Sequence, residues 1–301
     1  MNFASTPESV ITRAAPYAIS GGSIGAILMD IGRLTPEAAE RILKLQKESG
    51  LRFGDAAIKL GLLTEMDVRF ALSRQFDYPN LAPGDKSVSE EVVAAFKPYS
   101  PAVERLRALR SQLMLRCFDL DAENRSEKHC LAIVSPEQGE GRSYLAANLA
   151  VVFSQLGERT LLIDADLRQP RQHELFCLGN HAGLSAVLSG RANMDDAIHR
   201  IPNLLGLSVM PAGAIPPNPQ ELLSRLAFGN LLNDARERFD IVLIDTPDAS
   251  RSADVETIAT RAGAALAVSR KHFTSTRRLQ LLVDSLRQAG SPVVGVVLNE
   301  F

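Results

Sequence analysis

The sequence has few cysteines, little net charge and no long apolar run. Its three cysteines, Cys117, Cys130 and Cys177, show no metal-ligand spacing and cannot all pair with one another, so we expect reduced thiols in a cytoplasmic protein. The net charge of −2 gives no reason to expect nucleic acid or an anionic membrane surface as a partner. No apolar run approaches the ~20 residues that cross a bilayer, and the first ten residues do not resemble a signal peptide. Any association with a membrane is therefore expected to go through a partner.

An internal repeat marks the first part of the chain, whose 301 residues are enough for two domains. Six residues recur at an offset of 54 − 25 = 29: Gly25, Gly32, Leu34, Thr35, Leu43 and Gln46 return as Gly54, Gly61, Leu63, Thr64, Leu72 and Gln75. Each copy predicts a short helix, a glycine stop, a threonine N-cap and a second helix. We therefore expect a flexible N-terminus over 1–21 and a small all-α domain over 22–80, in which the two copies pack together.

Residues 81–100 read as a linker, because prolines and a glycine punctuate them, and a short helix is expected near 89–96. The domain expected over 101–301 alternates apolar runs with helical segments. The predicted strands are 130–135, 160–166, 207–213, 240–247, 264–270 and 293–300, and the predicted helices are 143–156, 172–176, 184–188, 219–238, 254–261 and 275–289. Near-continuous apolar strands separated by helices are typical of an α/β fold with a parallel sheet flanked by helices.

A glycine-rich turn follows the first of these strands. Gly139, Glu140, Gly141, Arg142 and Ser143 stand between that strand and a helix. Glycines let backbone N–H groups surround phosphate oxygens, the helix N-terminus adds its dipole, and the serine is placed to ligate Mg²⁺.

Carboxylates at later strand ends support a nucleotide site. Asp164 and Asp166 end one apolar run, in LLIDADLRQP, and Asp245 ends another, in IVLIDTP. The carboxyl ends of parallel strands form the ligand-binding edge of such a sheet. Because Mg²⁺ takes a few carboxylates together with water, these residues predict a metal–nucleotide site.

These motifs, together with VMPAGAIPPNPQELL and the terminal GVVLNEF, make residues 20–301 resemble the bacterial tyrosine kinases of polysaccharide operons, in particular chain-length-determinant kinases of the EpsG type. That family belongs to the deviant P-loop ATPases, with MinD and ParA. The resemblance implies that Mg-ATP is the substrate and that residues 139–143, with Tyr144 and Asn299, bind the nucleotide. It assigns catalysis to Asp164 as the base, with Asp166 and Arg142, and the metal to Ser143, Asp166 and Asp245.

Two features depart from the family pattern. Arg142 stands where the family has lysine, and a guanidinium is longer, planar and bidentate. The family also carries a C-terminal tyrosine cluster, whereas this chain has Tyr17, Tyr78, Tyr99 and Tyr144, so we expect the acceptor tyrosines elsewhere in the chain or on another protein. Two alternatives stay open: a MinD- or ParA-like nucleotide switch without kinase activity, and an adaptor with a vestigial site.

The resemblance also implies partners. Glu104, Arg107 and Arg110 match the E-x-x-R-x-x-R helix with which these kinases form homo-oligomeric rings, and a solvated helix face is the alternative. A transmembrane chain-length-determinant protein is the implied partner at the inner face of the membrane. The N-terminal repeat resembles the N-terminal domain of type II secretion ATPases, some of which bind cyclic di-GMP. Arg52 precedes Gly54 as that motif requires, but Ser23 precedes Gly25.

Overall fold

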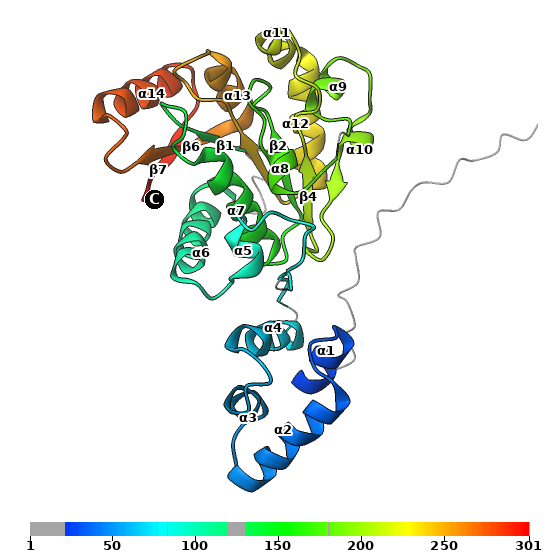
Figure 1. Ribbon diagram of the computed structural model, residues 1–301. Helices are drawn as coiled ribbons and strands as arrows, with labels where there is room; N and C mark the ends of the chain where they lie inside the picture. Colours follow the sequence, from blue (N-terminus) through cyan, green and yellow to red (C-terminus); the bar gives the residue numbers. More distant parts are fainter. Residues whose placement is uncertain (1–21, 77, 83, 119–129, 180, 301) are drawn as a thin grey trace, which may run out of the picture. The chain divides into compact units, whose positions relative to one another are not determined.

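The computed structural model describes residues 22–300 except 77, 83, 119–129 and 180. The chain divides into two compact units, Met1–Tyr78 and Pro79–Phe301 (Figure 1). The N-terminus expected to be flexible, with Tyr17, lies outside the described residues. Within the part that is described, no helix has the length and apolar character needed to cross a membrane.

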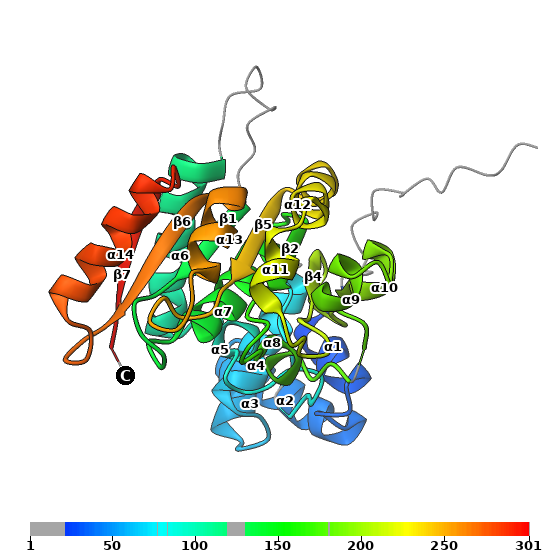
Figure 2. The same ribbon diagram turned by 90° about the horizontal axis from the view of Figure 1, so that it is seen from above.

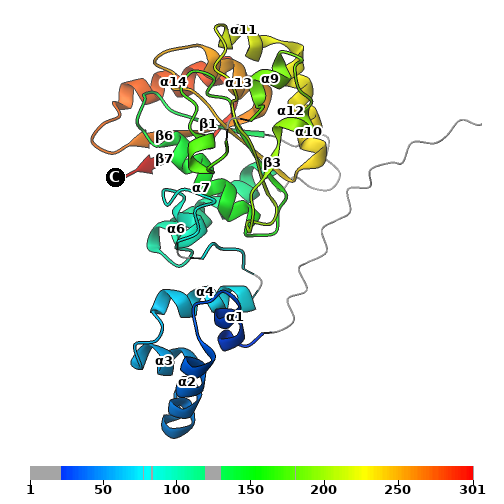
Figure 3. The ribbon, with the colours of Figure 1, turned by 45° about the vertical axis from the view of Figure 1, so that its right-hand side comes forward.

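The first unit is the predicted helical repeat, and Figure 3 shows its four helices. They are α1 (Ile24–Asp30), α2 (Pro36–Ser49), α3 (Phe53–Lys59) and α4 (Glu65–Gln75), so equivalent helices start 53 − 24 = 29 and 65 − 36 = 29 residues apart. Thr35 and Thr64 cap α2 and α4 through their side chains. Gly32 and Gly61 adopt φ +70° and +66°, the left-handed conformation that favours glycine. The predicted caps and stops are confirmed.

The two copies bury each other's apolar faces. Helix α1 packs against α4, and α2 packs against α3. Their shared core consists of Ile27, Leu28, Leu34, Ala39, Ile42, Ala56, Ala57, Leu63 and Ala71. A pocket of about 390 Å³ also lies in this unit, lined by Ser23, Ile24, Gly25, Ala26, Met29, Ala39, Leu43, Gln46, Phe53 and Gln75.

The expected linker 81–100 is part of the second unit instead, which starts at Pro79. Its apolar residues join the core of that unit, where Leu81, Val88, Val92, Ala94 and Ala95 are almost fully buried. The expected helix is only the four-residue α5 (Val93–Phe96). Prolines and glycine shape this segment, but its apolar residues fix it to the second unit because they gain burial there.

The second unit is built on a seven-stranded sheet, which Figure 2 shows with helices on both of its faces. The strand order is β3-β4-β2-β5-β1-β6-β7. All neighbouring strands are parallel except β3, which runs antiparallel to β4. The strands are β1 (Cys130–Val134), β2 (Thr160–Asp164), β3 (His199–Arg200), β4 (Leu207–Met210), β5 (Ile241–Asp245), β6 (Gly263–Arg270) and β7 (Val293–Asn299). The six predicted strands are confirmed, whereas β3 is too short to leave an apolar run in the sequence.

The helices form two layers. One cluster of buried residues joins α5, α6 and α7 to the sheet, and the other joins α9 and α11–α14 to the opposite face. The bounds are α6 (Pro101–Leu113), the π-helical segment η1 (Met114–Phe118), α7 (Arg142–Ser154), α8 (Gln172–Leu175), α9 (Leu184–Leu188), α10 (Met194–Ala197), α11 (Pro219–Ser224), α12 (Leu226–Arg238), α13 (Asp254–Ala262) and α14 (Thr276–Gln288). The predicted helix 219–238 is divided at Arg225, whose ψ of 152° is extended.

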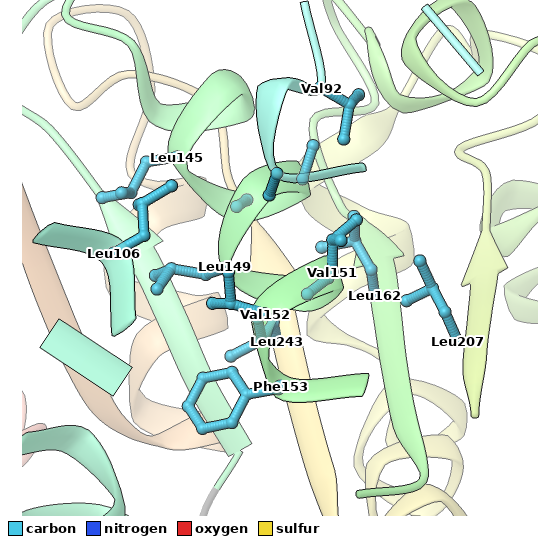
Figure 4. Close-up of a cluster of buried hydrophobic side chains, with 14 of the residues drawn as sticks. Val92, Leu106, Leu145, Leu149, Val151, Val152, Phe153, Leu162, Leu207 and Leu243 are labelled. Atoms are coloured by element: carbon cyan, nitrogen blue, oxygen red, sulfur yellow. The ribbon is translucent and has the colours of Figure 1, made fainter. Parts of the chain in front are cut away.

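Helix α7 is buried on nearly every side, and this fixes the turn that precedes it. Figure 4 shows its Leu149, Val152 and Phe153 among side chains from the sheet and from α6. The Phe153 ring meets Phe118 edge-on at 5.5 Å between centroids. Each fully buried leucine or phenylalanine contributes about 1.5–3 kcal/mol relative to exposure. The start of α7 is therefore held firmly against the carboxyl ends of the strands.

Candidate functional site

The glycine-rich turn connects β1 to α7 in the conformation that its glycines allow. Gly139 and Gly141 have φ of +79° and +89°, and Gly141 is the N-cap of α7. A side chain at either position would strain the backbone. The turn thus ends at the N-terminus of a 13-residue helix, where backbone N–H groups and the helix dipole favour an anion.

Glu140 braces this turn with a fully buried side chain. Its carboxylate accepts hydrogen bonds from the Glu137 backbone N–H, at 2.9 Å, and from the Thr274 hydroxyl. Burial raises the pKa of Glu140, and the bond from Thr274 opposes that shift. Asn299 donates to the Glu140 carbonyl at 3.1 Å. The predicted residues Glu140 and Asn299 are therefore adjacent, and any phosphate contact by Glu140 is left to its backbone.

The Arg142 guanidinium is only 7 % exposed and spans three parts of the site. Its Nε donates to the Thr246 carbonyl at 2.8 Å, just beyond β5. One terminal nitrogen donates to the Ser135 hydroxyl at 2.5 Å and to the Glu137 carbonyl at 3.2 Å. The other lies 3.9 Å from Asp166 Oδ2. Arg142 thus joins the ends of β1 and β5 through its own side chain.

Asp164 and Asp245 meet because β5 lies between β1 and β2. They are direct partners in the β2–β5 register, and both are fully buried. Burial, then repulsion from Asp245, raises the pKa of Asp164 well above its usual value. Burial also raises the pKa of Asp245, to about 6, although Arg142 and a bond from Gln172 favour its ionised form. Two carboxyl groups in one buried place disfavour each other's ionisation.

Asp166 lies at the same edge and is 5 % exposed. Its Oδ1 accepts from the backbone N–H groups of Arg168, at 3.1 Å, and Gln169, at 2.8 Å. These bonds orient the carboxylate beside Arg142. The structure therefore brings together the predicted residues Arg142, Ser143, Asp164, Asp166 and Asp245.

The donor set fits Mg²⁺. Asp245 Oδ1 is buried and has no hydrogen-bond partner within the described residues. A divalent cation would use this oxygen and relieve the repulsion between the paired carboxyl groups. No set of three or more His, Cys, Asp or Glu side chains in the described part forms a complete metal site. Mg²⁺ needs only one or two carboxylates with a hydroxyl, water and substrate phosphates, so Ser143, Asp166 and Asp245 are sufficient candidates.

The remaining predicted nucleotide residue, Tyr144, follows Ser143 in the first turn of α7. Its side chain is half-buried, and burial, then the nearby Glu91, raises the pKa of its hydroxyl. Sequence reasoning missed Gln172, Thr246 and Thr274. Thr246 could have been found from the sequence, because it follows Asp245 directly in the IDTP motif. Gln172 and Thr274 had none, because only the fold brings them to the turn.

Glu104, Arg107 and Arg110 lie on α6, whose buried side carries Val103, Leu106 and Leu113. Arg107 forms an ion pair with Glu104, whose side chain is 60 % exposed. Arg110 donates to the Val152 carbonyl at 2.7 Å. In a single chain these charges therefore already have contacts of their own.

Comparison with known proteins finds relatives that are named as tyrosine-protein kinases. No family model matches the chain. It is 34 % identical over 217 residues to the putative tyrosine-protein kinase CapB of Staphylococcus aureus, covering 71 % of this chain and 91 % of CapB. It is 34 % identical over 212 residues to tyrosine-protein kinase YwqD of Bacillus subtilis, covering 70 % of this chain and 86 % of YwqD. The chain spans only 28 % of the Escherichia coli tyrosine-protein kinase etk, at 32 % identity over 207 residues.

Solved structures agree with these relatives. The kinase domain of Escherichia coli tyrosine kinase ETK matches with a TM-score of 0.66 at 32 % identity, covering 73 % of this chain and 82 % of that one. MinD of Pyrococcus horikoshii with Mg-ADP matches at 0.51 and 22 % identity, covering 57 % and 70 %, which supports the shared fold alone. The predicted parallel sheet of a P-loop fold and the enzyme class are confirmed, and a MinD-like switch is not favoured. The chain belongs to the family of bacterial tyrosine-protein kinases.

Proposed function

We propose that this chain phosphorylates protein tyrosine with Mg-ATP and thereby regulates the chain length and export of an exopolysaccharide. The observation that carries the proposal is the convergence of the Gly139–Ser143 turn, buried Arg142 and three carboxyl groups at one edge of the sheet. Relatives support the setting, since one is a putative kinase named EpsB from Ralstonia solanacearum and another lies in the cps region of Klebsiella pneumoniae.

Each residue has a role in this proposal. Backbone N–H groups of residues 139–143 and the Arg142 guanidinium hold the phosphates. Ser143, Asp166 and Asp245 hold Mg²⁺, which when bound neutralises charge on the phosphates. Asn299 and Tyr144 border the nucleotide.

Asp164 is the proposed base for the tyrosine hydroxyl. Its raised pKa makes the ionised form a stronger proton acceptor but lowers the ionised fraction at neutral pH, and a cation at the neighbouring Asp245 would restore the ionised form. Since its carboxyl is fully buried and accepts backbone N–H groups of Asp166, Arg171 and Gln172, an acceptor tyrosine reaches it only after this edge opens. We therefore expect phosphorylation to be slow until a partner rearranges this edge into an ordered site that is open to the acceptor tyrosine.

The decisive experiment is mass spectrometry for phosphotyrosine after incubation with Mg-ATP and the cytoplasmic tail of the partner. Asp164→Asn should lower phosphorylation while calorimetry still detects nucleotide binding to the folded variant. Nucleotide-dependent assembly with no phosphotyrosine on any protein would favour the switch. A folded protein that binds no nucleotide at millimolar concentration would favour the adaptor.

For assembly and location, we propose homo-oligomeric rings and a place at the cytoplasmic face of the membrane, reached through a transmembrane chain-length-determinant protein. The exposed Glu104 and its neighbour Arg107 support a charged contact between subunits. Light scattering tests the ring: the triple alanine variant at Glu104, Arg107 and Arg110 should lose mass where the wild type is oligomeric. An unchanged mass would refute it.

For the helical unit, we propose weak binding of cyclic di-GMP. Arg52 is exposed at the N-cap of α3, where its guanidinium can reach a phosphate from solvent, and this supports a phosphate contact. Ser23 instead caps α1 by accepting from the Ala26 N–H at 3.3 Å, so the first copy offers no guanidinium. Hydrogen exchange should show protection within residues 22–75 when the dinucleotide is added. No change at high micromolar ligand would end this proposal.

A further inference from the structure

Gln172 contacts all three parts of the candidate site. It is the first residue of α8 and is fully buried. Its side-chain Nε2 donates to Asp245 Oδ2 at 2.8 Å and to the Ser143 carbonyl at 3.1 Å. Its backbone N–H donates to Asp164 Oδ2 at 2.9 Å. One residue thus joins the first turn of α7 to the ends of β5 and β2.

These contacts fix the direction of the Gln172 amide. Both partners of its Nε2 are acceptors, so reversing the amide would set oxygen against oxygen twice. The Oε1 atom must therefore point the other way. It is buried and has no hydrogen-bond partner in the described part of the chain. A buried acceptor without a donor is costly, which points to a ligand that brings one.

The carboxylate that Gln172 Nε2 bonds carries a second buried acceptor without a hydrogen-bond partner in the described residues. Asp245 Oδ2 is held by Gln172, while Oδ1 of that carboxyl is also buried and unpaired within the described residues. A hydrated Mg²⁺ satisfies both atoms, because the ion suits a carboxylate oxygen and its water molecules are donors for an amide oxygen.

We propose that Gln172 is a positioning residue for the metal–nucleotide complex. Its Nε2 restrains Asp245 so that Oδ1 remains available as a metal ligand, and its Oε1 accepts a hydrogen bond from a metal-bound water. This inference rests on the proposed function, since it requires Mg-nucleotide at this site. Gln172 reaches the metal only through other groups, so its loss weakens the dependence on Mg²⁺ and leaves phosphate binding in place.

The test uses Gln172→Leu, which keeps the approximate shape and removes both polar functions. The matched control is Gln155→Leu, because Gln155 is also a buried amide and donates to the carbonyls of Pro79, at 2.9 Å, and Ala94, at 3.0 Å, away from the site. Calorimetry measures the affinity for ADP with and without Mg²⁺ on the full chain, and thermal unfolding monitors the fold of each variant.

We expect Gln172→Leu to reduce the Mg²⁺-dependent gain in ADP affinity about 10- to 100-fold, the range for losing a hydrogen-bond partner of a metal ligand or of a metal-bound water. Its ADP affinity without Mg²⁺ should stay close to that of the wild type, because the Gln172 side chain bonds Asp245 and the Ser143 carbonyl and none of the backbone N–H groups proposed to hold the phosphates. Gln155→Leu should lower thermal stability and leave the Mg²⁺ gain unchanged.

The outcomes separate the two levels of the argument. A wild-type protein that binds no Mg-nucleotide would overturn the proposed function and this inference with it. A wild type with a clear Mg²⁺ gain that Gln172→Leu retains would overturn the inference alone. Equal losses with and without Mg²⁺ in Gln172→Leu would also overturn it, because they indicate a purely structural role.

Discussion

Replacing Arg142 tests whether its guanidinium binds the nucleotide phosphates in place of the lysine that the family has at this position. In the free protein it donates to the Thr246 carbonyl, the Ser135 hydroxyl and the Glu137 carbonyl. A hydrogen bond from a charged donor contributes about 1.5–3 kcal/mol. A lysine ammonium keeps some of these bonds but cannot match the planar fork, so Arg142→Lys should cost about 1.5–3 kcal/mol of unfolding free energy. Arg142→Ala should cost about 3–5 kcal/mol, because the acidic edge also loses its buried cation.

The effect on nucleotide should differ between the two variants. Arg142→Ala removes one charge-assisted phosphate contact, so its affinity for Mg-ADP should fall about 10- to 150-fold. Arg142→Lys keeps the charge, and its turnover should rise or stay the same. Urea unfolding without nucleotide measures the loss of stability, and calorimetry measures the loss of Mg-ADP affinity. Phosphotyrosine formation in the presence of the cytoplasmic tail of the partner measures turnover.

Two results would refute this reasoning. If Arg142→Ala binds Mg-ADP as tightly as the wild type, the guanidinium stays on Thr246 and Ser135 and is no phosphate ligand. If Arg142→Lys is folded, binds nucleotide and still shows no kinase activity with the cytoplasmic tail of the partner, a nucleotide switch is favoured over a tyrosine kinase.

Three further results are expected. Because burial raises the pKa of Asp245 to about 6, the folded state holds this proton longer than the unfolded state, so its contribution to stability is present below pH about 4 and is lost as the pH rises through 6. Asp245→Asn should flatten this pH dependence of stability in urea unfolding at pH about 3.5 and about 7 without Mg²⁺, two values that bracket the window of about 4 to 6, and an unchanged pH dependence would contradict it. Iodoacetamide at neutral pH should label the exposed Cys177 and spare the two cysteines whose pKa burial raises to about 12, Cys117 and Cys130; label on all three in the folded protein would refute this. Autophosphorylation within the described part should map to Tyr99, which is 42 % exposed in the turn before α6, and tandem mass spectrometry that finds phosphate only on a half-buried tyrosine would argue against it.

Local features of the fold could be read from the sequence because neighbouring residues produce them. Thr35 and Thr64 cap helices with their own side chains, and Gly32 and Gly61 end helices by entering the left-handed region. Apolar runs marked six of the seven strands, since a strand buried on both faces needs apolar side chains throughout. The prediction of a linker over 81–100 was wrong because it was based on the prolines and glycine of this segment. Its apolar residues are buried by partners far along the chain, which the local sequence does not show.

The sequence by itself determined the glycine turn before α7 and the acidic residues that end β2 and β5, because these follow from local backbone conformation and strand termination. Only the tertiary structure decided how they combine. The insertion of β5 between β1 and β2 makes Asp164 and Asp245 direct neighbours, and it sets the Thr246 carbonyl within reach of Arg142. The positions of Gln172 and Thr274 arise in the same way. Their hydrogen bonds to Asp245 and Glu140 span 73 and 134 residues of sequence, so they form only when the strands of the sheet have assembled in their final order.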